Sequence, residues 1–133
     1  MLKFALPFIA FALFDIAAFG SVPAHAADRL AGSEWGFEGE DLPFIQFGSD
    51  GRVSGSSGCN RFTGGYEAAE DGSIKIGPLA GTRMACPEPA MSAEAKFLSA
   101  LDATRRYERD GIRLSLRGED GVVLMELAQR DAD

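Results

Sequence analysis

The sequence predicts an α+β fold: a mostly antiparallel β-sheet or partly open barrel of about seven to eight strands, with one α-helix over about residues 88–101. Two patterns predict it. Asp-Gly dipeptides recur between short apolar or alternating segments, and this dipeptide signals a hairpin because both residues tolerate positive φ. A single segment between two of these turns is instead rich in Ala, Glu, Leu and Met. The Asp-Gly pairs occupy residues 50–51, 71–72, 110–111 and 120–121.

The strands are expected on either side of these turns. Ile112, Leu114 and Leu116 alternate with polar residues, which is typical of a strand with one buried face. Residues 122–125 are all apolar and predict a central strand or one covered by the helix. Segment 79–84 predicts a short strand of its own. The other predicted strands cover residues 33–38, 44–47, 52–54, 65–68, 73–76 and 105–109.

The helix is predicted from apolar periodicity and from the residues at its start. Met91, Ala95, Leu98 and Leu101 recur at spacings that place them on one helical face. Prolines precede the periodic run, where they suit a first turn. Glu88 and Glu94 lie toward the start, where the helix dipole favours carboxylates. We expect the helix to pack on the sheet or to plug it.

The first 26 residues have the pattern of a cleaved signal peptide. Lys3 precedes an apolar run over residues 4–19, interrupted by Asp15, and residues 24–26 read Ala-His-Ala, a small-x-small cleavage signal. A membrane span needs about 20 apolar residues and tolerates a carboxylate poorly. We therefore expect a single domain over residues 27–133, soluble and periplasmic or secreted. No cysteine lies near the cut, so a lipoprotein is not expected.

Charge and composition exclude several classes of function. The net charge is −7, and it stays −7 after the leader is cut because one base and one acid leave together. An acidic surface argues against nucleic acid and against anionic lipid headgroups. The leader also carries His25, the only histidine. A chain without it lacks Ser-His and Cys-His dyads and imidazole metal ligands. We expect no catalytic residue, metal or cofactor; an enzyme using carboxylates alone is the remaining catalytic alternative.

The two cysteines, Cys59 and Cys86, are most simply explained as a structural disulfide in an exported protein. Closing a loop of about 28 residues stabilises a chain by about 3–4 kcal/mol in the chain-entropy account. A redox pair and free buried thiols are the alternatives. The redox alternative has neither a Cys-x-x-Cys spacing nor a histidine partner.

Polar residues flank both cysteines and form a candidate binding patch: Asn60, Arg61, Thr82 and Arg83. A disulfide would bring the two cysteine Cα atoms to about 6 Å, so all four residues would lie close together. The functional interpretation is a site for an anion or a partner. In the structural interpretation, Asn60 and Thr82 bond loop backbone groups, and the arginines pair with surface acids such as Glu88 or Glu94.

Three further motifs have structural explanations that we prefer. The Gly-Ser-rich segment 55–65 lacks the Gly-Lys-Ser/Thr ending of a phosphate-binding loop. The Asp-Gly turns lack the Asp-x-Asp-x-Asp spacing of a calcium loop. The aromatic residues of the first half are expected mostly in the core, although a small barrel can also hold an apolar ligand. That alternative predicts a cavity lined from Trp35, Phe44, Phe47 and Leu98.

Residues around the two cysteines resemble the META domain family, which includes HslJ-like heat-shock proteins of the bacterial envelope. The family pattern has Gly-Cys-Asn-x-Phe/Tyr-x-Gly, then Thr-x-Met-x-Cys-Pro, then a helix with Glu and Phe-Leu. The matching positions are Gly58, Cys59, Asn60, Phe62 and Gly64; Thr82, Met84, Cys86 and Pro87; and Glu94, Phe97 and Leu98.

The resemblance implies an antiparallel sheet or partly open barrel with one helix, in an envelope or secreted protein linked to stress or drug tolerance. It implies no enzymatic activity. We expect a monomeric, non-enzymatic binding or stress-response module whose partner is an unknown protein or a small apolar ligand. The alternative is a carrier of small lipids or apolar ligands, like the lipid-binding pilot proteins of secretion systems. No stable membrane insertion is expected after signal cleavage.

Overall fold

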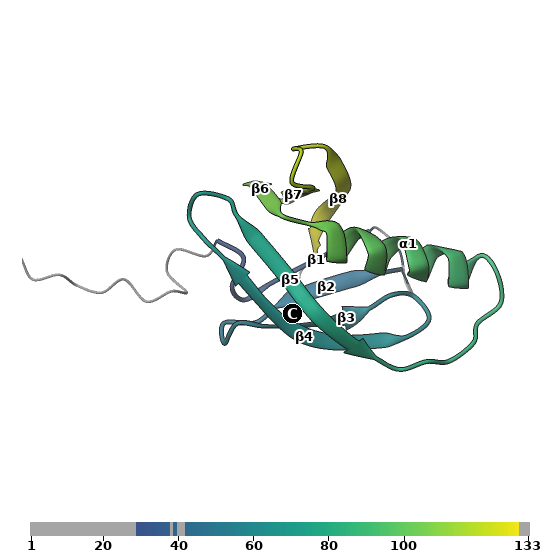
Figure 1. Cartoon of the computed structure of the whole chain (residues 1–133). Helices are drawn as coiled ribbons and strands as arrows, with labels where there is room; N and C mark the ends of the chain where they lie inside the picture. Colours follow the sequence, from purple (N-terminus) through teal and green to yellow (C-terminus); the bar gives the residue numbers. More distant parts are fainter. Residues whose placement is uncertain (1–28, 38, 40–41, 131–133) are drawn as a thin grey trace, which may run out of the picture.

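The computed structural model describes residues 29–37, 39 and 42–130 (Figure 1), and these residues form one eight-stranded antiparallel sheet with a single helix. This confirms the predicted α+β fold.

The predicted signal peptide lies outside the described residues. Across the part of the chain that is described, no helix has the length and apolar character needed to cross a membrane. The elements are β1 (Ser33–Gly36), β2 (Phe44–Phe47), β3 (Arg52–Ser56), β4 (Arg61–Ala68), β5 (Ile74–Gly81), α1 (Ala90–Ala103), β6 (Arg106–Asp110), β7 (Arg113–Arg117) and β8 (Val123–Arg130).

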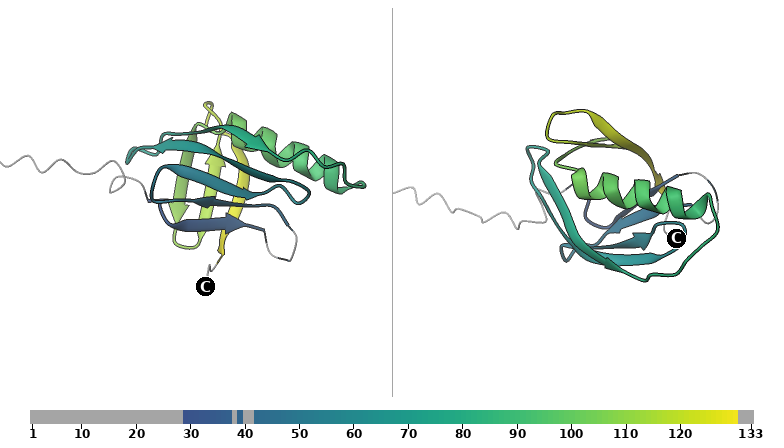
Figure 2. Two further views of the ribbon diagram at one scale, coloured as in Figure 1. Left: turned by 90° about the horizontal axis from the view of Figure 1, so that it is seen from below. Right: turned by 45° about the vertical axis from the view of Figure 1, so that its right-hand side comes forward.

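The sheet consists of two runs of hairpins joined where β1 pairs with β8. The strand order is β5-β4-β3-β2-β1-β8-β7-β6, so β5 and β6 are the two edges. The edges meet at one corner, where Ser73 bridges Arg106 and the Ile74 N–H donates to the Arg105 carbonyl at 3.0 Å. Figure 2 shows how strongly the sheet curls to bring these edges together. Because they touch only at this corner, the sheet is a partly open barrel.

Helix α1 covers the part of the barrel that the edges leave open. Figures 1 and 2 show it between the β4–β5 hairpin and the β6–β8 strands. Its Phe97 ring packs between Phe37 and Phe62, with centroids 6.4 and 6.0 Å away. Burying a side chain such as Phe97 or Leu101 stabilises a fold by about 1.5–3 kcal/mol. The helix therefore belongs to the same hydrophobic core as the strands.

The buried face of α1 is rotated slightly from the apolar face that the spacing predicted. Glu94, Phe97 and Leu101 are buried, whereas Ala95, which we placed on the apolar face, is exposed. The spacing alone could not choose between residues 94 and 95, and the apolar residue was the natural choice. The helix also begins at Ala90, two residues later than predicted. Glu88 lies just before it and accepts hydrogen bonds from the N–H and hydroxyl of Ser92, at 3.2 and 2.7 Å.

The barrel interior is filled by side chains from both hairpin runs. Trp35, Phe47 and Leu114 are completely buried, and the Phe47 and Tyr66 rings meet edge to face at 4.9 Å. The indole Nε1 of Trp35 donates to Ser33 Oγ at 2.6 Å, which satisfies its one polar group. The interior between the strands is thus a packed core.

Two strand predictions need correction. Segment 79–84 is not a separate strand: residues 79–81 continue β5 past Gly77, whose φ of 100° lets the strand bend, and residues 82–84 leave the sheet. Residues 123–125 belong to β8, which lies between β1 and β7 and is a central strand, as one of the two predicted alternatives had it. The other alternative is wrong: residues 122–124 are not covered, since Val122 is 58% exposed and its two neighbours are also open to solvent. Strand β1 pairs with β8 only from Ala128 onward, so the first half of β8 extends beyond β1 and contacts β7 alone within the sheet.

Candidate functional site: a groove beside the Cys59–Cys86 clasp

A groove of about 370 Å³ lies between the end of β5 and the first half of α1. Its walls are mainly apolar, with Phe62 from β4, Leu79 from β5, and Met91 and Leu98 from the helix. The volume falls in the range of about 300–1,000 Å³ that is typical of ligand sites. All four residues of the predicted patch also line this groove: Asn60, Arg61, Thr82 and Arg83.

Asn60 fixes the end of the groove where the chain leaves β5. Its Oδ1 accepts hydrogen bonds from Thr82 Oγ1 at 2.8 Å and from the Met84 N–H at 2.7 Å. Its Nδ2 donates to the Met84 carbonyl at 3.1 Å and to Glu94 Oε1 at 2.8 Å. A side-chain amide has two donor hydrogens and one oxygen with two lone pairs, so every hydrogen-bonding position is used. Asn60 therefore holds the loop in place and has no group left for a ligand.

The turn before Asn60 brings a second polar side chain to the same point. The Ser57 N–H donates to the Asn60 carbonyl at 2.8 Å, and the Asn60 N–H donates to Ser57 Oγ at 3.1 Å. Gly58 in this turn has φ of 98°, a conformation that glycine adopts without strain. The Ser57 hydroxyl reaches Glu94 Oε1, and a carboxylate is its strongest available acceptor.

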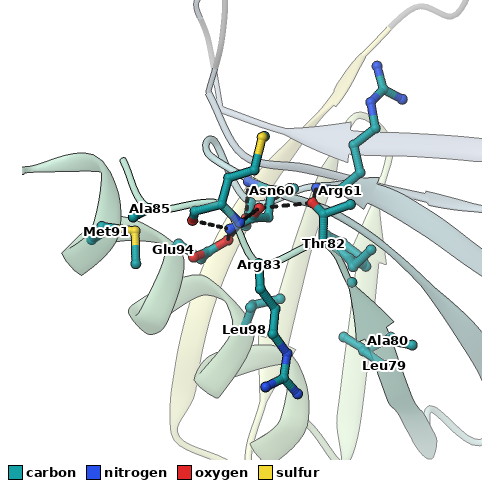
Figure 3. Close-up of a pocket in the computed structure, with 14 residues that line it drawn as sticks. Asn60, Arg61, Leu79, Ala80, Thr82, Arg83, Ala85, Met91, Glu94 and Leu98 are labelled. Carbon is teal, nitrogen blue, oxygen red and sulfur yellow. Dashed lines mark hydrogen bonds between the residues drawn. The ribbon is translucent and has the colours of Figure 1, made fainter. Parts of the chain in front are cut away.

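The disulfide joins this turn to the segment that follows β5. Cys59 and Cys86 are bonded, with their Cα atoms 6.1 Å apart, as the sequence predicted for the cysteine pair. We call the disulfide together with the hydrogen bonds of Asn60 and Ser57 the clasp. It binds strand β4, the loop after β5 and helix α1 into one unit. Figure 3 shows the part of the clasp around Asn60, with its hydrogen bonds as dashed lines.

Thr82 bonds backbone groups of the loop, which was the structural one of the two interpretations predicted for it. Besides bonding Asn60, its Oγ1 accepts the Arg61 N–H at 3.1 Å, and its own N–H donates to the Arg61 carbonyl at 3.0 Å. These bonds continue the β4–β5 pairing by one residue beyond the strand. Asn60 and Thr82 thus build the wall of the groove.

The two arginines of the patch are placed differently from each other. In Figure 3 their side chains extend in opposite directions, so they do not converge on a common anion. Among the described residues, the ion pairs are Arg117–Glu108 and Arg130–Glu34. The predicted pairing of Arg61 or Arg83 with Glu88 or Glu94 is therefore wrong. Arg83 remains at the rim of the groove and is exposed to solvent.

A family model described as the META domain matches residues 24–131. The chain belongs to the META domain family. No curated protein sequence is significantly similar to it. The matched residues include every part of the clasp and the groove.

Solved structures share the fold of this META domain. An NMR structure of a protein from Burkholderia xenovorans has 25% identity and a TM-score of 0.64, with 81% of this chain and 88% of that chain covered. Another NMR structure has 22% identity and a TM-score of 0.60, covering 77% and 92%. A crystal structure of a DUF4847 family protein from Bacteroides vulgatus ATCC 8482 has 22% identity and a TM-score of 0.54, covering 70% and 62%.

Glu94 of this META domain is buried, contrary to the prediction from its place near the start of the helix. We predicted a carboxylate at the start of the helix that faces solvent or an arginine, but it is only 8% exposed and lines the groove. A signal was present in the sequence. Met91, Glu94, Leu98 and Leu101 are spaced three, four and three residues apart, so Glu94 occupies a position where this helical period places an apolar side chain.

The prediction of an interior cavity lined by aromatic residues is wrong for the described part of the chain, because the interior is packed. Trp35 and Phe47 are part of the packed core, and Phe44 lies under the Arg130 guanidinium, 4.7 Å from the ring centroid. Of the four predicted lining residues, only Leu98 reaches the groove. The candidate site of this META domain is therefore the groove between the sheet edge and the helix. Among the described residues, no three His, Cys, Asp or Glu side chains are grouped closely enough to hold a metal ion.

Proposed function

We propose that this META domain is an exported, non-enzymatic binding module of the cell envelope that acts in stress response, and that it binds through the groove between β5 and α1. The groove is the observation that carries the proposal. It combines apolar walls with a few polar groups at fixed positions, which is the usual make-up of a small-molecule site. The role in stress rests on the family resemblance alone.

The groove is pre-organised, which favours binding. Asn60 has all its hydrogen-bonding positions occupied, and the disulfide fixes the loop that forms the rim. A site that is already ordered loses less conformational entropy when a ligand enters. The same disulfide is typical of proteins that fold in an oxidising compartment, which supports export.

A carrier of small apolar ligands is the second candidate, and the composition of the groove favours it. Phe62, Leu79, Met91 and Leu98 give the walls an apolar surface that would otherwise face water. As a carrier, the protein would transport the ligand. As a binding module, it would respond to the ligand in the stress response. Both versions use the same groove, so one experiment locates the site for both.

The experiment is a ligand screen by native mass spectrometry on the oxidised protein, purified after expression with its own leader. Met91 lines the groove from α1, is half-buried and is not part of the core cluster, so Met91→Trp should fill the groove without disturbing the core. Ala93 is exposed on α1 and does not line the groove, so Ala93→Trp is the matched control. We expect bound ligand to be lost from Met91→Trp only. A ligand retained equally by both variants would contradict the proposed site.

A further inference from the structure

Glu94 is the one charged residue that is buried in the described part of the chain. Burying a carboxylate is costly unless hydrogen bonds and an opposite charge compensate for lost hydration. Most of the neighbouring helix surface is exposed, and a glutamate on that surface would have kept its hydration. The position of Glu94 therefore requires an explanation beyond helix formation.

The hydrogen bonds to Glu94 come from neutral groups, and both reach the same oxygen. Asn60 Nδ2 lies 2.8 Å from Oε1, and the Ser57 hydroxyl also reaches Oε1. No arginine or lysine of the described residues forms an ion pair with this carboxylate. Arg61 and Arg83 also line the groove, but Figure 3 shows both side chains extending away from Glu94.

The second oxygen, Oε2, is left for a ligand. No described residue donates a hydrogen bond to it. The buried side-chain atoms without a partner in this part of the chain are Arg117 Nε and Arg130 Nη1, so Glu94 Oε2 is not sealed inside the protein. Since Glu94 lines the groove, the groove is the open space beside this carboxylate.

The groove thus presents one fixed carboxylate oxygen beside apolar walls. Attraction between opposite charges is stronger beside low-dielectric walls than in open water. A neutral apolar molecule would leave the carboxylate uncompensated, and an anion would be repelled by it. A cation with an apolar body would satisfy both features at once.

We propose that the groove binds a small amphiphilic primary amine, with the ammonium donating to Glu94 Oε2 and the hydrocarbon chain lying against Phe62, Leu79 and Leu98. This inference rests on the proposed function, because it takes the groove as the binding site. It adds the chemical class of the ligand and the residue that selects it. Asn60 and Ser57 are positioning residues, since they hold Oε1 and so aim Oε2.

The test is an NMR titration of the ¹⁵N-labelled oxidised protein with three probes of equal chain length: n-octylammonium, n-octanol and octanoate. At neutral pH the first is a cation, the second is neutral and the third is an anion. We expect octylammonium to shift the amide signals of Gly81, Met84, Glu94 and Leu98, and to bind about tenfold more tightly than octanol, as a charge-assisted hydrogen bond would provide. Octanoate should bind more weakly than octanol.

Two variants separate the groove carboxylate from general charge attraction. In Glu94→Gln the amide oxygen can still accept from Asn60 and Ser57, so the clasp is kept while the charge is removed. Glu88→Gln removes the same charge from the same end of the helix but outside the groove. We expect Glu94→Gln to lower octylammonium affinity to that of octanol, and Glu88→Gln to leave it unchanged.

Each other outcome overturns a defined part of the account. If octanol or octanoate binds as tightly as octylammonium to the unmodified protein, the amine inference fails, although the groove remains the binding site. Equal losses in both variants would reduce the effect to general charge attraction and would also overturn it. If none of the three probes shifts the groove amides, both the inference and binding of small ligands in this groove fail. The comparison of probes needs no variant, so it stands even if Glu94→Gln does not fold.

Discussion

The two ends of strand β5 are held in different ways. At its start, main-chain hydrogen bonds join it to the opposite edge: Ile74 N–H to Arg105 carbonyl at 3.0 Å and Tyr107 N–H to Gly72 carbonyl at 2.8 Å. At its end, the chain leaves the sheet and is held by the side chains of Asn60 and Thr82 and by the disulfide. We call these regions the closed corner and the clasp.

The difference shows where this small barrel can have a site. At the closed corner the two strand edges use each other's backbone groups, and the gap disappears. At the clasp the end of β5 does not pair with the other edge, and the groove lies between β5 and α1. Side chains therefore do at the clasp what backbone pairing does at the corner, while leaving space for a ligand. Substitutions at the clasp and at the closed corner should therefore affect the protein differently.

Asn60→Ala should destabilise the protein most, by about 3–5 kcal/mol, because it removes four hydrogen bonds and leaves buried Glu94 with one donor fewer. Urea denaturation of the oxidised protein measures the free energy of unfolding. Gln46→Ala removes an exposed amide from β2 and serves as the control, with an expected change within about 0.5 kcal/mol. A loss below about 1 kcal/mol for Asn60→Ala would show that the clasp does not depend on this residue.

Replacing both cysteines by alanine should cost about 3–4 kcal/mol, as expected for opening a closed loop of this size. Loss of the disulfide should also affect local stability more at the end of β5 than at its start. Amide hydrogen exchange should accelerate at Met84, whose N–H bonds Asn60, and remain slow at Tyr107, which lies at the closed corner. Conditions must keep the variant fully folded, so that local and not global opening is measured. Equal acceleration at both amides would mean that the two regions are not independent.

Thr82→Val should have a smaller effect, about 1 kcal/mol, because it keeps the side-chain shape and removes one hydroxyl. That hydroxyl donates to Asn60 Oδ1 and accepts the Arg61 N–H, so the loss is confined to the clasp. Thr63→Val is the matched control on the exposed face of β4 and should change stability by less than about 0.5 kcal/mol. Thermal unfolding of both variants gives the comparison, and equal shifts in Tm would count against a role for Thr82.

The smallest effect concerns pH and the closed corner. The hydrogen bond from the Ser73 hydroxyl, and then that from the Ser73 N–H, lower the pKa of Asp71 below its ordinary value of 3.8. A carboxyl whose pKa is lowered in the folded state stabilises the protein above its unfolded pKa, and this contribution is lost as the pH falls through the folded value. The Tm difference between the unmodified protein and Asp71→Asn should thus shrink below about pH 4. A difference that is the same at pH 7 and pH 3 would contradict this.

Local patterns predicted most of the fold. The Asp-Gly turns and the flanking alternation located the hairpins, because a tight turn and its strands depend on neighbouring residues. The helix and the cysteine pair were also found from spacing and composition. The end of β5 could not be predicted in this way. Whether residues 79–81 continue the strand depends on their pairing with residues 62–64 of β4. The exposure of Val122 depends in the same way on where β1 ends.

The candidate site was predicted in part. Asn60, Arg61, Thr82 and Arg83 do line one groove, because the disulfide brings together the two segments that carry them. The directions of the two arginine side chains could not be read from the sequence, and neither could the burial of Glu94. A glutamate is normally placed at the surface, and its burial here depends on donors from a turn more than 30 residues away in sequence.

The central claim is that this META domain binds at the clasp and not at the closed corner. The most direct measurement is chemical-shift mapping of the oxidised protein with n-octylammonium or with a ligand found in the native mass spectrometry screen. The account predicts shifts concentrated in residues 57–62, 79–85 and 91–98, which surround the groove. Shifts concentrated in residues 69–73 and 105–107, at the closed corner, would contradict it.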